Sequence, residues 1–326
     1  MNRETSRATA VSSRAATGGE VRPQAGQSWA TLGFLSILWG GSFFFYKVLA
    51  PSLPPLTLVF GRVGFAAVAL LAVLAVGRRE FPLGASKIGW FLVLGAFNCA
   101  IPFSLYAWSE RFVTSGVAAT LNATTPIFTG IAMHLSSRDD RLTRRKIIGI
   151  ACAFCGVAVL IGRDLLSGLS LSVLPGELAC LGATTSYAIG AVLTRKLRGV
   201  APLQLTTGQL AGAALVIFPL ALLHDGFSAW RGLGAETWAA WLGIALLSTA
   251  LAYLIFFRIL TVHGANQAVL VTFLVPVSAL AMGALLLGET LKWNTLAGAV
   301  LISCGLAVID GRLLRRLWRR EAPCPS

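Results

Sequence analysis

Long apolar runs recur along this chain, and they limit its fold more than any other feature. Each run has about 20 residues, enough as a helix to cross the roughly 30 Å hydrocarbon core of a bilayer. A segment inside the bilayer must satisfy its own backbone groups, so the runs are expected to be helices. We identify about ten by this length criterion, at residues 29–47, 55–76, 88–109, 113–135, 146–162, 174–194, 203–223, 237–257, 264–287 and 293–311. The predicted fold class is an all-α integral membrane protein with ten transmembrane helices.

The composition supports this class and excludes an ordinary soluble domain. Of the 326 residues, 56% are hydrophobic and 12% are charged, and the mean hydropathy is +0.76. Soluble domains carry about 25% charged residues. The lipid bilayer is therefore the predicted partner of most of the surface.

A formal net charge of +14 could suggest a nucleic-acid partner, but the basic residues are placed as in a membrane protein. With the amino terminus inside, 21 of the 27 Lys and Arg residues fall in inner segments, five fall in outer segments, and Arg62 lies within a span. Basic loops near membrane helices stay in the cytoplasm during insertion. This bias predicts cytoplasmic termini and a multi-pass protein of the inner (plasma) membrane, without a nucleic-acid partner.

The two ends of the chain differ from the spans. Residues 1–28 are polar and rich in Ser, Thr, Ala and Arg, so we expect a disordered basic cytoplasmic tail. A transit peptide is the alternative, which Glu4 and Glu20 oppose. Residues 312–326 are expected to form a second basic cytoplasmic tail that resembles a membrane-surface helix.

The second half of the chain repeats the first. The segment IIGIACAFCGVAVLIG (147–162) aligns with LAGAVLISCGLAVIDG (296–311), and PIFTGIAMHL aligns with PVSALAMGAL. The coincident residues include Gly149 with Gly298, Gly156 with Gly305 and Pro126 with Pro276. Because each half has five spans, an odd number, the second half must enter the membrane from the opposite side. The chain is predicted to be two inverted five-helix repeats, a common architecture of alternating-access carriers.

Several stretches resemble the EamA family of the drug/metabolite transporter superfamily. They are LWGGSFFFYKVL (38–49), DRLTRRKIIGIACAFCGVAVLIG (140–162), GELACLGATTSYAIGAVLTRKL (176–197) and the segment 269–309. The similarity extends over roughly residues 29–311, with SRDDRL standing where the family usually has Gly-Glu. It implies a metabolite transporter with a first repeat at 29–162, an external linker at 163–173 and a second repeat at 174–311.

Motifs of enzyme chemistry are not found in the sequence. It lacks a GxxxxGK[ST] phosphate loop, so transport driven by ATP hydrolysis in this chain is not expected. Cys152 and Cys155 have CxxC spacing, but without a second pair or a nearby histidine helix packing is favoured over a metal site. No catalytic residue, metal or cofactor is predicted. An integral-membrane enzyme, a flippase for lipid-linked substrates, and a receptor or scaffold remain alternatives, although the inverted repeat opposes an enzyme or receptor.

The acidic residues lie in loops, in the tails or near span ends, and none is expected at mid-membrane. Small multidrug carriers of the superfamily resembled here exchange protons for cationic drugs at an embedded glutamate, and a charge at that depth is retained for function. Proton-coupled efflux of cations is consequently disfavoured. Facilitated diffusion or exchange, or coupling at the interface, fits better.

Arg62 is the exception among the basic residues because it lies within the second span. By helix rise it is about 10 Å from the outer end, so snorkelling to the headgroups is the favoured interpretation. A deeper arginine costs about 2.5–3.5 kcal/mol to insert. A role inside the bundle, such as pairing with a substrate carboxylate, is the alternative.

Other polar and aromatic residues in the spans, Gln209 among them, are candidates for a substrate pathway. Aromatic residues near span ends are more often interface anchors, so Tyr46 and Trp108 have low weight. Asn98 lies near the middle of its span, where an interhelical hydrogen bond is the favoured use. The residues retained for the pathway are Trp39, Asn98, Tyr106, Tyr187 and Tyr253.

The stretch VAATLNATTPIFTGI (117–131) supplies the most specific prediction. Pro126 has no N–H, so it should kink the fourth span and leave the carbonyl of Asn122 free. Pro276 should do the same for Thr272 in the second half. Polar residues at interrupted helices of both halves indicate a substrate site, which would also include Thr125 beside the first proline. The alternative is that both prolines only bend their helices.

Together these features predict a secondary transporter that works by alternating access. Its substrate would be a small polar or amphipathic metabolite, such as an amino acid or derivative, and export is the favoured direction. A monomer and a homodimer both remain open.

Overall fold

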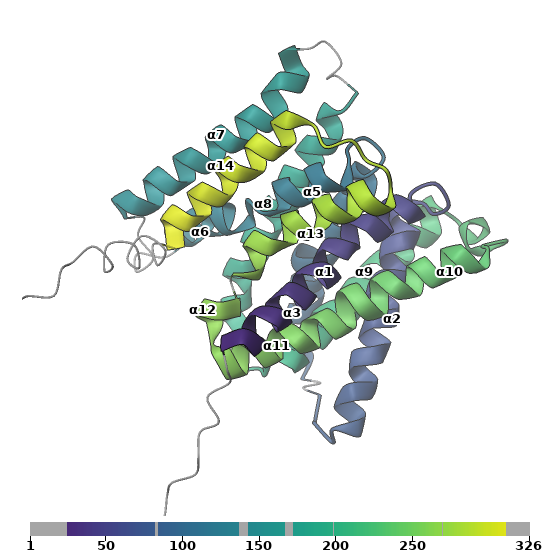
Figure 1. The fold of residues 1–326 in the computed structure, drawn as a ribbon. Coiled ribbons are helices and arrows are strands. Elements are labelled where there is room, and N and C mark those ends of the chain that lie inside the picture. The colour runs from purple at the N-terminus through teal and green to yellow at the C-terminus, as the bar shows by residue number, and fades with distance from the viewer. Residues whose placement is uncertain are drawn as a thin grey trace, which may run out of the picture.

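The computed structural model describes residues 25–81, 84–136, 143–166, 172–197, 199–268 and 270–310, and all regular elements within them are helices (Figure 1). The all-helical class is therefore confirmed. Residues 1–24 and 311–326, which hold most of the two predicted tails, lie outside the described residues, as do SRDDRL (137–142) and residues 167–171 of the predicted linker.

The first half of the chain contains eight helical elements. They are α1 (Ala25–Leu49), α2 (Pro55–Val76), α3 (Ala85–Gly95), the π-helix η1 (Ala96–Ala100), α4 (Ile101–Ser109), α5 (Ser115–Asn122), α6 (Thr125–Ser136) and α7 (Arg144–Leu166). The second half begins with α8 (Leu174–Thr194), the 3-10 helix η2 (Arg195–Leu197), α9 (Pro202–His224) and the 3-10 helix η3 (Phe227–Trp230). It continues with α10 (Ala235–Leu242), the π-helix η4 (Gly243–Leu251), α11 (Ala252–His263), α12 (Ala265–Ala268), α13 (Val271–Leu286) and α14 (Trp293–Asp310).

Seven helices among the described residues are long and apolar enough to cross a membrane. They are Trp29–Leu49, Pro55–Val76, Ser86–Ser109, Leu174–Leu197, Pro202–His224, Ala235–His263 and Trp293–Asp310. The other three predicted spans are helical too, but α5 and α6 divide the fourth, α7 covers the fifth, and α12 and the shorter apolar α13 divide the ninth. The chain is thus a multi-pass membrane protein.

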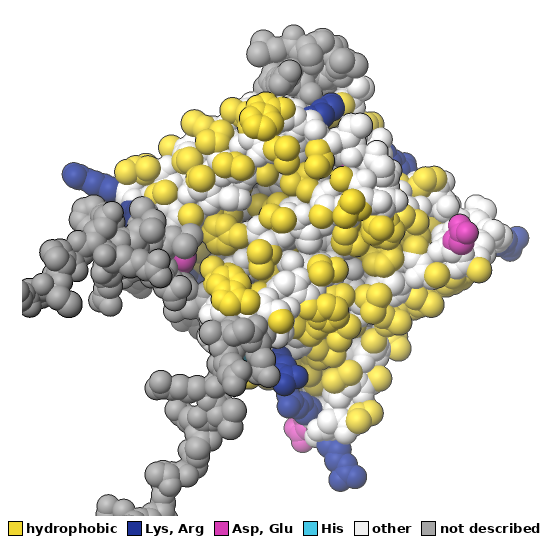
Figure 2. Space-filling model, viewed as in Figure 1, with side chains coloured by type: hydrophobic (Ala, Val, Ile, Leu, Met, Phe, Trp, Pro, Cys, Tyr) yellow, Lys and Arg dark blue, Asp and Glu magenta, His cyan; other side chains and the backbone are white. Residues whose placement is uncertain are grey.

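The outer surface agrees with a lipid environment. Large apolar side chains project from several helices, among them Val76 at 87% exposed and Leu285 at 83%. The face in Figure 2 is mainly hydrophobic, with Lys and Arg side chains near its margins. An apolar belt with charges at its edges is what a bilayer requires.

The fourth predicted span is interrupted immediately before its proline. α5 ends at Asn122, and α6 begins at Thr125 with Pro126 in its first turn, where the missing N–H costs no helical hydrogen bond. The second half differs, because Pro276 lies inside α13 and the interruption falls before Val271. Both spans are therefore interrupted, but the predicted interruption at Pro276 is wrong.

Two glycine pairs allow α7 and α14 to lie against each other along one side of the bundle (Figure 1). A methyl group added at Gly149 would lie 2.6 Å from the carbonyl oxygen of Gly305, and one added at Gly305 would lie 2.5 Å from that of Gly149. Gly156 and Gly298 have the same reciprocal relation at 2.9 Å. Glycine thus lets the two backbones touch, as at other close helix crossings in membranes.

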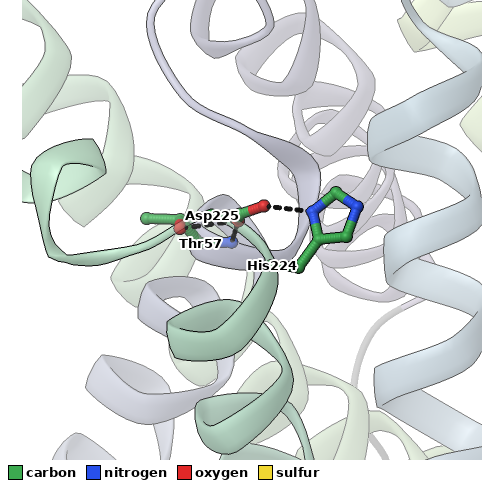
Figure 3. A network of polar contacts seen from close by, with 3 residues as sticks. All are labelled: Thr57, His224 and Asp225. Carbon is green, nitrogen blue, oxygen red and sulfur yellow. Dashed lines mark hydrogen bonds and ion pairs between the residues drawn. The ribbon is translucent and has the colours of Figure 1, made fainter.

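A polar clamp fixes the beginning of α2 to the end of α9 (Figure 3). The Asp225 carboxylate accepts hydrogen bonds from the Thr57 N–H at 2.9 Å and from its hydroxyl at 2.8 Å. His224 lies 2.9 Å from the other carboxylate oxygen. Pro54, the residue before α2, makes no side-chain cap, so Asp225 serves as the cap from another helix.

Candidate substrate cavity

A cavity of about 680 Å³ lies between helices of both halves. The first half contributes residues of α1, α2, η1, α4, α5 and α6, and the second contributes residues of α8, α9, η4, α11 and α13. Two of these elements are π-helical segments, which often occur at functional sites. The cavity therefore lies where the sequence repeats meet.

All of the predicted pathway residues except Pro276 line this cavity. Pro276 is buried in α13 and lies outside the lining. The lining includes the predicted Trp39, Arg62, Asn98, Tyr106, Asn122, Thr125, Pro126, Tyr187, Tyr253 and Thr272. The structure thus brings together residues from seven predicted spans.

Arg62 lies inside the bundle, so the snorkelling interpretation is wrong. Its residue is 5% exposed, and its Cζ stands 3.8 Å from the centre of the Phe103 ring. Nη1 donates to the Tyr46 hydroxyl, and Nε donates to the Thr249 hydroxyl at 3.0 Å. Nη2 donates to the Ser42 hydroxyl at 3.3 Å. The guanidinium is thus held by hydroxyls and aromatic faces.

Tyr46 is not an interface anchor, as its place in the sequence suggested. It is 1% exposed, and besides accepting from Arg62 it presents its ring 5.1 Å from the Arg62 Cζ. It lies about two helical turns beyond Trp39 on α1, so both side chains lie on the same face and line the cavity. The positions of the aromatic residues in the sequence do not indicate which face of α1 is buried.

Amides and hydroxyls form two interhelical groups on the cavity wall. Asn98 Nδ2 lies 3.3 Å from both Gln209 Oε1 and Thr194 Oγ1, so the predicted interhelical hydrogen bonding of Asn98 is confirmed. The Tyr106 hydroxyl donates to Asn122 Oδ1 at 2.9 Å. The polar side chains of the described lining are neutral apart from the guanidinium of Arg62.

The carbonyl of Asn122 is not free, contrary to the prediction. The Thr125 hydroxyl donates to it at 2.7 Å, and the Thr124 hydroxyl donates to the carbonyl of Leu121 at 2.6 Å. Threonine side chains therefore satisfy the carbonyls at the interruption, a local alternative to the helical ladder. What Asn122 offers the cavity is its side-chain amide.

Aromatic rings form the rest of the wall. Trp39 packs edge-on against Tyr253 with ring centres 6.2 Å apart, and against Phe256 at 5.3 Å. The ring centres of Tyr106 and Tyr187 are 6.4 Å apart. These rings provide a broad apolar surface beside the polar groups.

A charged cluster lies where α1, the α4–α5 connection and the end of α13 meet. Lys47 Nζ donates to the carbonyls of Glu110 at 2.6 Å and Val113 at 2.8 Å. Glu110 is 1% exposed, and one of its carboxylate oxygens accepts from the Ser115 hydroxyl. Burial raises the pKa of the Glu110 carboxyl well above its ordinary value, opposed by the Lys47 ammonium and reinforced by Glu289. The sequence placed these residues near span ends but did not indicate that they meet.

The sequence prediction missed several lining residues. Gln209 was a polar candidate that was not retained, although Gly208–Gln209 follows the pattern of Gly61–Arg62, and Ser248 could have been found because it lies 150 positions after Asn98. The remaining missed residues are small or apolar and carry no distinct signal. They are Ser42, Phe43, Phe103, Thr129, Ala191, Thr194, Phe256 and Val275, together with the undervalued Tyr46.

Membrane helices around an internal polar and aromatic cavity define a membrane transport protein. A family comparison agrees: the model of the EamA-like transporter family matches residues 27–162 and 174–310. The chain belongs to this family, whose named members are transporters and efflux pumps rather than enzymes.

Individual relatives align along nearly their whole length. A Salmonella typhimurium protein named as a probable amino-acid metabolite efflux pump is 32% identical, over 88% of this chain and 97% of its own. A protein of the same name from Escherichia coli is 29% identical, over 89% and 96%. The Bacillus subtilis transporter YoaV is 26% identical, over 84% and 94%. A solved crystal structure shares the fold with a TM-score of 0.59 and 17% identity, over 89% of this chain and 99% of that one.

Proposed function

We propose that this chain is a ten-span secondary carrier that exports a small polar or amphipathic metabolite, such as an amino acid or derivative. The observation that carries the proposal is the central cavity, because both halves of the chain line it. A site between two halves can be exposed to either side of the membrane when the halves change conformation. The two repeats are proposed at 29–162 and 174–311, joined by an external linker at 163–173.

Reciprocal contacts support an inverted relation between the halves. The repeat alignment places Gly149 on Gly298 and Gly156 on Gly305, whereas the contacts join Gly149 to Gly305 and Gly156 to Gly298. Such crossed pairing is what a two-fold axis between α7 and α14 produces.

A second pair of contacts has the same form. A methyl group at Gly61 of α2 would lie 2.2 Å from the Trp241 ring, and one at Gly208 of α9 would lie 2.6 Å from the Phe91 ring. Phe91 and Trp241 are 150 positions apart in the third and eighth predicted spans. Each half thus inserts an aromatic ring against a glycine of the other.

The wall of the cavity supports a metabolite as substrate. Hydroxyls, amides and aromatic faces match a molecule that has both hydrogen-bonding groups and an apolar part. Two relatives bear the name of probable amino-acid metabolite efflux pumps, which favours amino acids or their derivatives and the export direction.

Exchange or facilitated diffusion is the proposed mode of transport. None of the described residues that line the cavity is acidic, so the wall offers no carboxylate to exchange a proton for a cationic drug. The sequence also has no phosphate-binding loop. Counterflow exchange should therefore persist after the pH gradient is collapsed.

The proposed location is the inner (plasma) membrane, with both termini in the cytoplasm. A reporter fused after Arg145 should be cytoplasmic and one fused after Arg231 external. Opposite labelling of these two positions would contradict the inverted topology.

The direct test is counterflow in proteoliposomes against a panel of amino acids, amino-acid derivatives without an ammonium group, nucleosides and sugars. We expect saturable exchange of at least one metabolite, and a several-fold loss in Trp39→Ala, because this ring forms part of the wall. Arg111→Gln, a change in an exposed loop, is the control and should transport as the wild type does. Absence of exchange across the panel, or movement of lipid-linked substrates instead, would refute the proposal.

A further inference from the structure

Arg62 gives the cavity a fixed positive charge. Among the described residues that line the cavity it is the one charged side chain, and no described carboxylate forms an ion pair with it. A guanidinium carries a permanent charge, and a buried charge without a counter-ion is unfavourable. The described wall of the cavity thus presents a cation without a carboxylate partner.

The geometry of the guanidinium leaves room for a ligand. Arginine has five N–H donors, and three are used, by Tyr46, Thr249 and Ser42. One N–H on each of Nη1 and Nη2 therefore has no acceptor among the described residues. Terminal N–H groups of this kind bind the two oxygens of a carboxylate with strong, charge-assisted hydrogen bonds.

The orientation of the guanidinium is fixed in advance. Its Cζ lies over the Phe103 ring, and its three hydroxyl partners come from α1 and η4, so it does not need to be ordered when a ligand binds. A ligand that meets a pre-oriented group loses less free energy to immobilisation. The hydroxyls stabilise the charge without neutralising it.

The rest of the wall determines what else the ligand should carry. Trp39, Tyr253 and Phe256 pack together as an aromatic surface, which suits an apolar or aromatic side chain. Among the lining residues that the structure describes, none supplies a carboxylate for an ammonium group. A zwitterion would leave its ammonium with neutral oxygens and ring faces alone.

We propose that the cavity selects amphipathic monocarboxylates, bound through Arg62, over zwitterions, neutral molecules and cations of the same shape. This inference rests on the proposed function and narrows its substrate class to acids or amino-acid derivatives that lack a free ammonium group. The carboxylate takes the two remaining N–H groups of Arg62, and the apolar part lies against the aromatic surface.

A matched series of phenyl compounds tests the selectivity. 3-Phenylpropionate is an anion, phenylalanine a zwitterion, 3-phenylpropanamide neutral and phenethylamine a cation, while the ring and its spacing stay similar. Isothermal titration of the purified protein in nanodiscs should give the tightest binding for 3-phenylpropionate, by about tenfold or more over the amide and the amine. The affinity for phenylalanine should be weaker than that for 3-phenylpropionate and stronger than that for the amide or the amine. This ranking is measured on the wild type and requires no variant.

Variants then assign the selectivity to Arg62. Arg62→Gln should reduce the affinity for 3-phenylpropionate about tenfold or more while changing that for the amide little. Arg62→Lys keeps the charge but loses the paired N–H geometry, and it should be intermediate. Arg111→Gln is the control for a basic residue outside the cavity, and thermal unfolding of each variant verifies that it is folded.

The outcomes separate this inference from the proposed function. Equal affinity for all four compounds, or unchanged preference in Arg62→Gln, overturns the carboxylate selectivity. The counterflow test then decides independently whether the protein transports a metabolite. No binding of any compound overturns the selectivity as well, and counterflow that depends on Trp39 would then still support transport. Loss of both binding and counterflow refutes the two together.

Discussion

Replacing Asp225 by alanine should destabilise the protein, because this residue caps a helix from which it is remote in sequence. α2 follows Pro54, which has no side-chain acceptor for the N–H groups of the first turn. Thr57 is 0% exposed, and its N–H and hydroxyl both donate to the Asp225 carboxylate. Alanine would leave both buried donors without an acceptor.

The magnitude follows from these two donors. An unsatisfied buried donor costs about 1–3 kcal/mol, and loss of an N-terminal cap, which includes one of the same donors, costs about 1 kcal/mol. We therefore expect Asp225→Ala to lower the free energy of unfolding by about 2–4 kcal/mol. Asp225→Asn keeps an acceptor oxygen and should lose only about 1 kcal/mol, the contribution of a charge at the helix terminus.

Unfolding titrations with sodium dodecyl sulfate in mixed micelles, followed by far-UV circular dichroism, measure these differences. His224→Ala is the matched control, because the His224 side chain is 80% exposed and contacts Asp225 from the solvent side. A double mutant with Thr57→Val should show less than the sum of the two single effects, since the pair shares its hydrogen bonds. Wild-type stability of Asp225→Ala, or strict additivity with Thr57→Val, would refute the capping role.

Further predictions concern helix packing, pH and transport. Gly156→Leu should separate α7 from α14 and cost about 1–3 kcal/mol in the same titration, whereas Gly130→Leu, where an added side chain meets open space, should not; equal effects would contradict the packing role. The raised pKa of Glu110 means that the folded protein keeps a proton which the unfolded chain releases above its ordinary value of 4.5. Stability should thus fall as pH rises from that value towards the folded pKa, and melting temperatures between about pH 5 and 9 should show a smaller fall in Glu110→Gln; parallel pH profiles would disprove this. Asn122→Leu and Thr272→Val, which alter the cavity wall, should each reduce counterflow severalfold at near-normal expression, and normal exchange in both would remove them from the site.

The helices could be predicted from sequence because the length of an apolar run sets the length of a helix in a bilayer. Each predicted span contains one or more helices among its described residues, and the interruption before Pro126 follows from the chemistry of proline. The residue at which a helix is interrupted could not be predicted in the same way. In the second half the helix passes through Pro276 and breaks earlier, because neighbouring helices and not the proline alone decide where backbone groups are satisfied.

The residues of the candidate cavity could be predicted only in part from the sequence. Polar residues such as Asn98 and Asn122 are conspicuous in an apolar span, and both line the cavity. The face that a helix turns to the interior is harder to predict, because in a bilayer both faces are apolar. Arg62 was therefore placed at the headgroups and Tyr46 at the interface, whereas tertiary packing brings them into contact inside the bundle.

The proposed two-fold relation also explains why the repeats predict the scaffold better than the site. Gly61 and Gly208 both accept an aromatic ring from the opposite half, yet the residues that follow them are Arg62 and Gln209. A second arginine would place two like charges against one cavity, where burial removes most of the screening by water. Gln209 instead supplies a neutral amide that contacts Asn98. The packing between the halves can therefore remain symmetrical, which allows the halves to exchange conformations. Only one half contributes a cation, Arg62, to the described lining, and we propose that this cation binds the substrate carboxylate.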